Sequence, residues 1–235
     1  MSSIKVFVEM GKKRTFAGAI DWPGWCRSSR DEKTALQALI DYAPRYAQVL
    51  QGREIIFHTP MNVADFMVTE RHQGNVTTDF GAPDILLAAD REALDRTELK
   101  RLQIILAACW QVFDEAVQRA AGRELRKGPR GGGRDLQKII DHVVEADQAY
   151  LRRLAWVHKP GGGDNPVEEL RRTQQAIVEA LEGAVAGELP ERGPRGGILW
   201  PPRYFIRRVA WHVLDHAWEI EDRMKSINIT SSPWS

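Results

Sequence analysis

The chain has 235 residues, of which 43% are hydrophobic and 28% are charged, so we expect one long or two modest globular domains. Its 33 lysines and arginines nearly balance its 32 aspartates and glutamates, which argues against nucleic acid or a membrane surface as a partner. No apolar run approaches the roughly 20 residues that span a bilayer, and two cysteines are too few for a disulfide framework, so we expect a cytoplasmic protein rather than a secreted or membrane protein.

The first part of the chain begins with the short period of β-strands. Residues 4–8 and 16–20 alternate on either side of a turn, and this pattern predicts a β-hairpin. Ser29 followed by Glu32 is a capping-box pattern, which predicts the start of a helix. Pro44 should kink or shorten that helix, because proline cannot continue the backbone hydrogen bonds.

Further strands are predicted beyond this helix. The short apolar or β-branched runs that indicate them are residues 55–57, 64–68 and 76–80. A hairpin, a helix and more strands together predict a small α+β domain over residues 1–88.

From about residue 91 the apolar positions follow the 3.6-residue period of helices. Start signals place two helices after Asp95 and at Asn165-Pro166, and the apolar period places two more from near Asp135 and from about Tyr204. Four amphipathic helices of about 20 residues, each about 30 Å long, predict a four-helix bundle. The bundle is expected over residues 91–226, followed by a tail at residues 227–235.

Three histidines fall within the helical pattern. His212 and His216 are four residues apart, so a helix places both imidazoles on one face. His142 lies in the apolar stripe of the second helix, so the three rings can meet in the interior. A buried imidazole needs a partner for each ring nitrogen, and a divalent metal would take one nitrogen from each ring. The alternative is a set of hydrogen-bonded core histidines.

A three-histidine site has a chemical consequence. Imidazole suits zinc, nickel, copper and iron, and three protein ligands leave one coordination position for water or a thiol. Glu145 and Asp215 are candidate acceptors for an imidazole N–H, although a surface carboxylate is the alternative for each. Arg208 and Trp211 are candidates for substrate contact, the first through a substrate carboxylate. Their alternatives are a surface ion pair and core packing.

The second and fourth predicted helices read DLQKIIDHVVEADQAYLRRL and YFIRRVAWHVLDHAWEIEDRM. They resemble the DinB/YfiT-like superfamily of four-helix-bundle metalloproteins, which has one histidine on the second helix and HxxxH on the fourth. The resemblance covers about residues 91–226 and implies a divalent metal, most often zinc or nickel, held by His142, His212 and His216. It also implies an unusual linkage of the helices, which the long connection between the third and fourth helices would serve. Some members are S-transferases or isomerases that use a low-molecular-weight thiol.

The segment KVFVEMGKKRTFAGAIDWPGWCRSSRDEKTALQALIDY resembles, more faintly, a HicB-type antitoxin fold. The resemblance implies an accessory, dimerising or partner-binding domain, and a generic ββα unit is the alternative. Exposed strands in this part are compatible with a homodimer.

Two functions follow from these observations. The first is a metal-dependent enzyme that activates a thiol or water for transfer to, or hydrolysis of, a small-molecule substrate. The second is a non-catalytic metal-binding or regulatory module, in which the N-terminal part recruits a partner. We expect no nucleic-acid or membrane partner for either.

Overall fold

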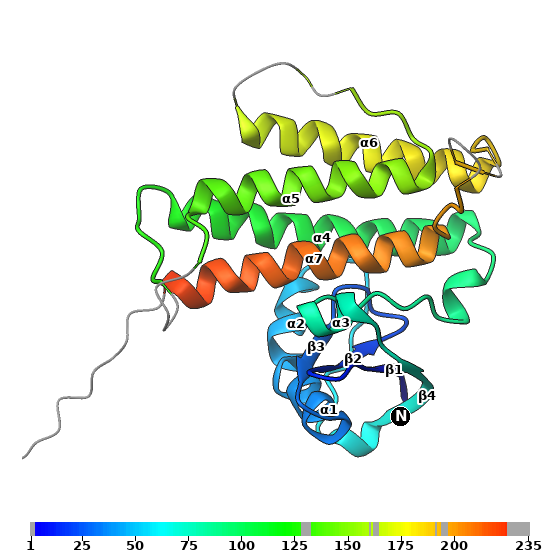
Figure 1. Ribbon diagram of the computed structural model, residues 1–235, viewed down its shortest axis with the longest axis vertical. Coiled ribbons are helices and arrows are strands. Elements are labelled where there is room, and N and C mark those ends of the chain that lie inside the picture. Colours follow the sequence, from blue (N-terminus) through cyan, green and yellow to red (C-terminus); the bar gives the residue numbers. More distant parts are fainter. Residues whose placement is uncertain are drawn as a thin grey trace, which may run out of the picture.

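The computed structural model describes residues 3–127, 133–159, 161, 165–190, 192–193 and 197–224. Figure 1 shows two parts, a smaller unit that contains a sheet and a larger part made of long helices. The predicted tail at residues 227–235 lies outside the described residues. None of the described helices combines the length and apolar character that a membrane span requires.

The N-terminal unit is built on a four-stranded sheet. Its strands are β1 (Ile4–Met10), β2 (Thr15–Ala19), β3 (Cys26–Ser29) and β4 (Phe66–Gln73), in the order β3-β2-β1-β4. The β1–β2 and β2–β3 pairs are antiparallel, so the predicted hairpin is confirmed. The β1–β4 pair is parallel, which requires a crossover between β3 and β4. Two helices supply it, α1 (Glu32–Asp41) and α2 (Ala43–Val49).

The start of α1 differs from the prediction by two residues. Asp31, not Ser29, caps the helix. Its carboxylate accepts from the Thr34 backbone N–H at 2.8 Å, and the Thr34 hydroxyl accepts from the Asp31 backbone N–H. Pro44 stands in the first turn of α2, so the predicted break is confirmed.

The predicted later strands are only partly right. No strand includes residues 55–57, and the run at 64–68 divides into a 3-10 turn, η1 (Val63–Asp65), and the beginning of β4. Residues 76–80 form a one-turn helix, α3 (Val76–Phe80), so that strand prediction is wrong. The reason is Asn75, whose side chain accepts from the Thr77 and Thr78 backbone N–H groups and nucleates a turn.

The long helices begin within about two residues of the predicted starts. They are α4 (Arg96–Ala120), α5 (Leu136–Leu151), α6 (Pro166–Ala186) and α7 (Pro202–Met224), with 3-10 turns η2 (Ala89–Arg91) before α4 and η3 (Arg152–Leu154) after α5. Asp95, Asp135 and Asn165 each accept from a backbone N–H in the first turn.

Helices α5 and α6 run in the same direction. Gln148 Nε2 donates to Thr173 Oγ1 at 3.4 Å, and the Trp156 ring lies 3.5 Å from the position a Gly183 Cβ would take. Both contacts join residues at a similar separation in sequence, which requires parallel helices. Helix α6 therefore begins at the opposite end of the helical part from the end of α5 (Figure 1). The unusual linkage of the helices therefore lies between α5 and α6, and not between the third and fourth helices, where the resemblance suggested it.

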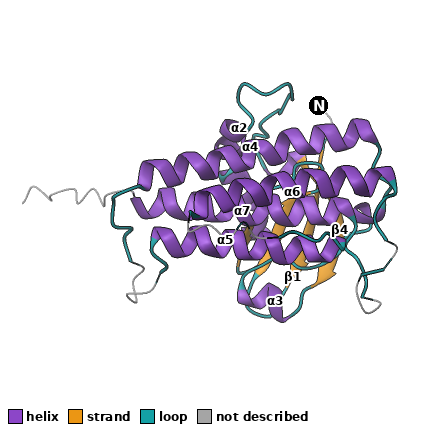
Figure 2. Ribbon diagram, turned by 90° about the horizontal axis from the view of Figure 1, so that it is seen from above, coloured by secondary structure: helices purple, strands orange, loops and turns teal. Residues whose placement is uncertain are grey.

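The segment between the two parts is held from both sides. The Glu9 carboxylate on β1 accepts from the Asp84 and Ile85 backbone N–H groups at 3.0–3.2 Å. On the other side, Arg207 of α7 forms a buried ion pair with Asp90 and donates to the Ile85 carbonyl at 2.9 Å. These contacts fix α7 against the sheet. Figure 2 shows the strands of the sheet lying across the long helices.

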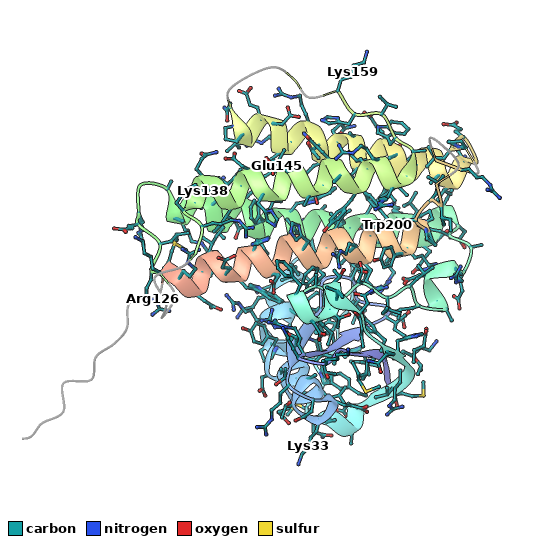
Figure 3. All side chains as sticks on the ribbon, viewed as in Figure 1. Lys33, Arg126, Lys138, Glu145, Lys159 and Trp200 are labelled. Atoms are coloured by element: carbon teal, nitrogen blue, oxygen red, sulfur yellow. The ribbon has the colours of Figure 1, made fainter. Side chains whose placement is uncertain are left out.

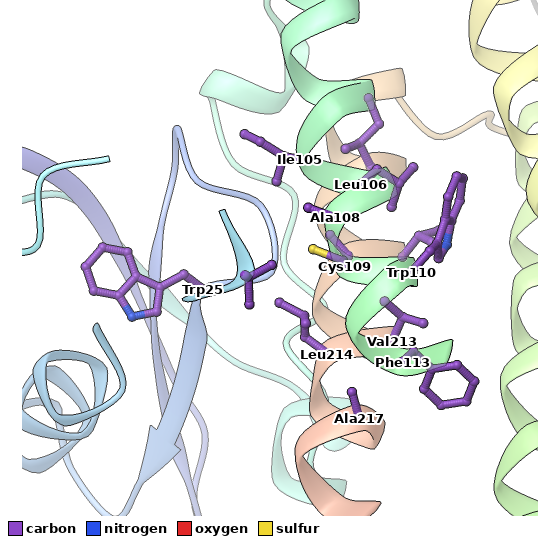
Figure 4. Close-up of a cluster of buried hydrophobic side chains, with 14 of the residues drawn as sticks. Trp25, Ile105, Leu106, Ala108, Cys109, Trp110, Phe113, Val213, Leu214 and Ala217 are labelled. Atoms are coloured by element: carbon purple, nitrogen blue, oxygen red, sulfur yellow. The ribbon is translucent and has the colours of Figure 1, made fainter. Parts of the chain in front are cut away.

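Both parts contribute to one apolar core. Trp25 on the sheet side and Cys109 and Leu214 on the helices belong to the same buried cluster (Figure 4). Gly24, which precedes Trp25, has φ +93° and makes a close approach to α7, because a Cβ there would lie 2.7 Å from Leu214 Cδ1. The N-terminal unit thus packs directly on the helix that carries two of the three histidines.

Candidate metal centre

The structure brings the three histidines together. His142 of α5 and His212 and His216 of α7 each offer a ring nitrogen, and these nitrogens all lie within 4.8 Å of one another. The Nε2 atoms of His142 and His212 are 3.3 Å apart. The three pairs of ring centroids are 4.7–5.1 Å apart, so no ring stands outside the group.

The helix directions explain this meeting. Helix α7 runs antiparallel to α5, because Arg208 lies beside Tyr150 while His212 lies beside His142. One turn of α7 separates His212 from His216, so both rings face α5 at adjacent levels. His142 is opposite them on α5 and is only half-buried, so the cluster reaches the surface on the α5 side.

Burial sets the electrostatics of the cluster. His212 and His216 are 6% and 8% exposed. Burial lowers the pKa of His212 well below its ordinary value, and the neighbouring imidazoles of His216 and His142 lower it further. The pKa of His142 is also lowered, first by burial and then by the Arg134 guanidinium. Both rings are therefore neutral near pH 7, which is the form that binds a metal.

The donor set fits a divalent cation. Zinc binds imidazole nitrogens at about 2.0–2.1 Å, and tetrahedral angles then place two such nitrogens about 3.4 Å apart. The 3.3 Å between the Nε2 atoms of His142 and His212 agrees with this separation. His212 Nδ1 is buried without a hydrogen-bond partner among the described residues, and a cation held at Nε2 would not contact it.

A residue that the sequence analysis missed lies against the cluster. Glu219 Oε2 is 2.9 Å from His216 Nδ1, and Arg223 Nη1 donates to Glu219 Oε1 at 2.8 Å. Burial alone would raise the pKa of Glu219, but the contacts with His216 and Arg223 outweigh it, so the pKa is lowered. The available signal was the three-residue spacing from His216, which puts the two side chains within reach on a helix.

The two predicted imidazole partners lie elsewhere. The Asp215 carboxylate accepts from Arg27 Nη1 at 3.1 Å, so it faces the N-terminal unit, and no hydrogen bond joins it to an imidazole among the described residues. Glu145 is exposed on α5 (Figure 3). Its charge raises the pKa of His142 slightly against the other effects, and no hydrogen bond joins the two among the described residues.

Arg208 and Trp211 have different surroundings. Arg208 is buried, donates to the Pro83 carbonyl, and places its Nε 3.4 Å from the Tyr150 hydroxyl, which accepts from it. No carboxylate lies within ion-pair distance of Arg208 among the residues that the structure describes. The Trp211 ring packs edge-on against Phe16, with centroids 6.1 Å apart, which agrees with the core-packing alternative, and its contact with a substrate stays a prediction.

Aromatic rings adjoin the histidines at one end. The Tyr150 ring is 5.9 Å from the His212 ring, and Trp200 is 5.2 Å from Tyr150 and 4.8 Å from Tyr204. Burial raises the pKa of Tyr150, and the neighbouring Arg208 charge opposes that shift. Trp200 could not be predicted as part of the site, because it stands in a glycine- and proline-rich stretch without a period.

A protein-family model described as the DinB superfamily matches residues 105–220. The match spans all three histidines and Glu219. Searches of curated proteins and of solved structures found no match for the chain. The HicB-like resemblance of the N-terminal unit stays a prediction.

Proposed function

We propose that the C-terminal part of this chain, which belongs to the DinB superfamily, binds one divalent cation through His142, His212 and His216. The observation that carries the proposal is the convergence of three imidazole nitrogens from two helices within 4.8 Å. We also propose that α4, α5, α6 and α7 form the four-helix bundle of that superfamily.

Zinc or nickel is the proposed cation, because the family resemblance favours these two, and both accept a donor set made only of imidazoles. Such a cation, when bound, offers a coordination position at which a thiol or water loses its proton near neutral pH. His142 is the half-buried member of the cluster, so we place the approach of a small-molecule substrate or thiol on the α5 side.

Arg208 is the proposed contact for an anionic group of the substrate. It lies one turn before His212 and is 9% exposed, and it has no carboxylate partner among the described residues. A buried guanidinium without an anion is costly, so a carboxylate of the substrate would compensate it. Tyr150, whose hydroxyl accepts from Arg208, borders the same space.

Elemental analysis tests the metal proposal. Purified protein should contain about one equivalent of zinc or nickel, and a chelator should remove it. His212→Ala should lose the metal, because two imidazoles hold a cation far less tightly than three. His58→Ala is the matched control, since His58 is exposed in the N-terminal unit. Full metal content in His212→Ala would contradict the assignment.

The second candidate function is a non-catalytic module, and one distance favours it. A separation of 3.3 Å between the Nε2 atoms of His142 and His212 also fits an N–H···N hydrogen bond. A protein that binds no added zinc, nickel or cobalt would establish this hydrogen-bonded network. A cobalt-loaded protein whose visible spectrum ignores added thiol would instead favour a metal-binding module without thiol chemistry.

A cytoplasmic location belongs to the same proposal. Its support is that Cys26 and Cys109 are both buried and unpaired, as expected in a reducing compartment. Fractionation of cells that express the full chain would test it, and recovery from a secreted fraction would contradict it.

A further inference from the structure

A line of polar contacts leads away from the histidine cluster along α7. His216 Nδ1 lies 2.9 Å from Glu219 Oε2, and Arg223 Nη1 donates to Glu219 Oε1 at 2.8 Å. The two oxygens of one carboxylate thus serve two different partners. The side chains are largely shielded, with 11% of His216, 32% of Glu219 and 14% of Arg223 exposed.

The line continues into the connection between α4 and α5. Arg223 Nε donates to the Arg126 carbonyl at 2.9 Å, and the Arg126 backbone N–H donates to the Arg223 carbonyl at 3.1 Å. Figure 3 places Arg126 beside the C-terminal end of α7. On the other side of the connection, a Cβ at Gly133 would lie 2.9 Å from Arg223 Nη2, and Gly133 has φ +125°. Arg223 therefore touches both described ends of the connection.

The chemistry of this carboxylate fixes the state of His216. An ionised carboxylate only accepts hydrogen bonds, so the shared hydrogen must sit on His216 Nδ1. The nitrogen left free to face the other two imidazoles is then Nε2. A metal-binding histidine needs an unprotonated nitrogen toward the metal and a fixed ring orientation. A carboxylate that accepts from the other nitrogen provides both.

We propose that Glu219 is the positioning residue of the histidine cluster: it fixes the tautomer and orientation of His216 and, through Arg223, ties that state to the connection between α4 and α5. The inference rests on the proposed metal site. Helix geometry supports Glu219 over the other carboxylates, because seven residues after His212 it returns to within about 20° of that histidine.

Metal affinity tests the positioning role. Competition with a chromogenic chelator should show zinc bound about 10- to 100-fold more weakly by Glu219→Gln than by the unsubstituted protein. Glu145→Gln is the matched control, since it removes a nearby carboxylate that makes no hydrogen bond to His142, and its affinity should not change. The visible spectrum of the cobalt-loaded protein should shift in Glu219→Gln and not in Glu145→Gln.

The tautomer can be read without any substitution. Nitrogen-15 NMR of the metal-free protein should show His216 protonated at Nδ1. A ring protonated at Nε2 would overturn the proposal, even if Glu219→Gln failed to fold.

Hydrogen exchange tests the link to the connection. Zinc should slow amide exchange at residues 121–127 in the unsubstituted protein, and Arg223→Gln should remove most of that effect while retaining zinc. Equal protection in both proteins would overturn the link.

If the unsubstituted protein binds no metal, the proposed function fails. If it binds zinc and Glu219→Gln binds equally well, only the positioning role fails.

Discussion

Asp147 shows how a single buried group makes stability depend on pH. It is fully buried on α5, and neither carboxylate oxygen has a hydrogen-bond partner among the described residues. Burial raises its pKa well above the ordinary value of 3.8. The folded protein therefore holds this proton more tightly than the unfolded chain. The resulting stability is fully present below pH 3.8 and is lost as the pH rises through the folded-state pKa.

Asp147→Asn should accordingly stabilise the protein at pH 7 and bring little gain near pH 4. The amide has the shape of the acid but no ionisation to suppress, and Tm should rise by about 2–4 °C for each kcal/mol of ionisation penalty removed. Thermal unfolding at both pH values checks this. Glu145→Gln on the same helix is the control, because that side chain is exposed. A variant less stable at pH 7 would mean that the carboxylate makes a stabilising contact.

The histidines were predictable from sequence, whereas their partner was not. An i, i+4 pair on an apolar helix fixes which rings share a face. Asp215 and Glu219 each stand three residues after a histidine, so spacing treats them alike. Only the tertiary structure separates their roles, because Asp215 accepts from Arg27 of β3 whereas Glu219 stays beside His216.

At the scale of single elements, capping residues decided most boundaries. Asp95, Asp135 and Asn165 start their helices as predicted, because a side-chain acceptor before an apolar stripe is a local signal. The same physics explains the error at residues 76–80. Val76 and Thr77 favour strands, but the Asn75 side chain accepts two hydrogen bonds from the first turn. These bonds stabilise the helix more than the strand preference of residues 76–80 stabilises a strand.

The cap of α1 allows a direct comparison of sequence and structure. Asp31→Ala should lower Tm by a few degrees, because the Thr34 backbone N–H loses its acceptor. Ser29→Ala should leave Tm unchanged, although the sequence pattern named Ser29 as the cap. Differential scanning calorimetry of the two variants measures this. A larger loss from Ser29→Ala would restore the sequence prediction.

At the scale of the molecule, α7 joins the two parts. Its Arg207 forms a buried ion pair with Asp90, at 2.5 Å, while its histidines face α5. The sequence predicted two successive parts, but no pattern in it indicated that Glu9 and Arg207 would bind the segment between them, at residues 84–90. Contacts between residues so distant in sequence have no periodic pattern, so they could not be predicted.

Asp90→Asn should lower the free energy of unfolding by about 3–5 kcal/mol, because it leaves Arg207 as an uncompensated buried charge. Replacing both residues, as Asp90→Leu with Arg207→Met, should recover part of the loss. Asp215→Asn is the control, since the Asp215 side chain is 44% exposed and its pair with Arg27 is worth at most about 1 kcal/mol. Denaturant titration followed by tryptophan fluorescence measures all three, and equal losses for Asp90→Asn and Asp215→Asn would contradict the expectation.

The place of α7 in the chain has a consequence for biosynthesis. It follows every other described helix and strand, yet Phe7 and Phe16 of the sheet share a buried cluster with its Trp211, and His142 meets its two histidines. A nascent chain therefore leaves the ribosome with an apolar sheet face and one side of α5 still uncovered. Both are covered only when the last helix emerges. Early release or a stalled ribosome would therefore yield a product with exposed apolar surface, which chaperones bind.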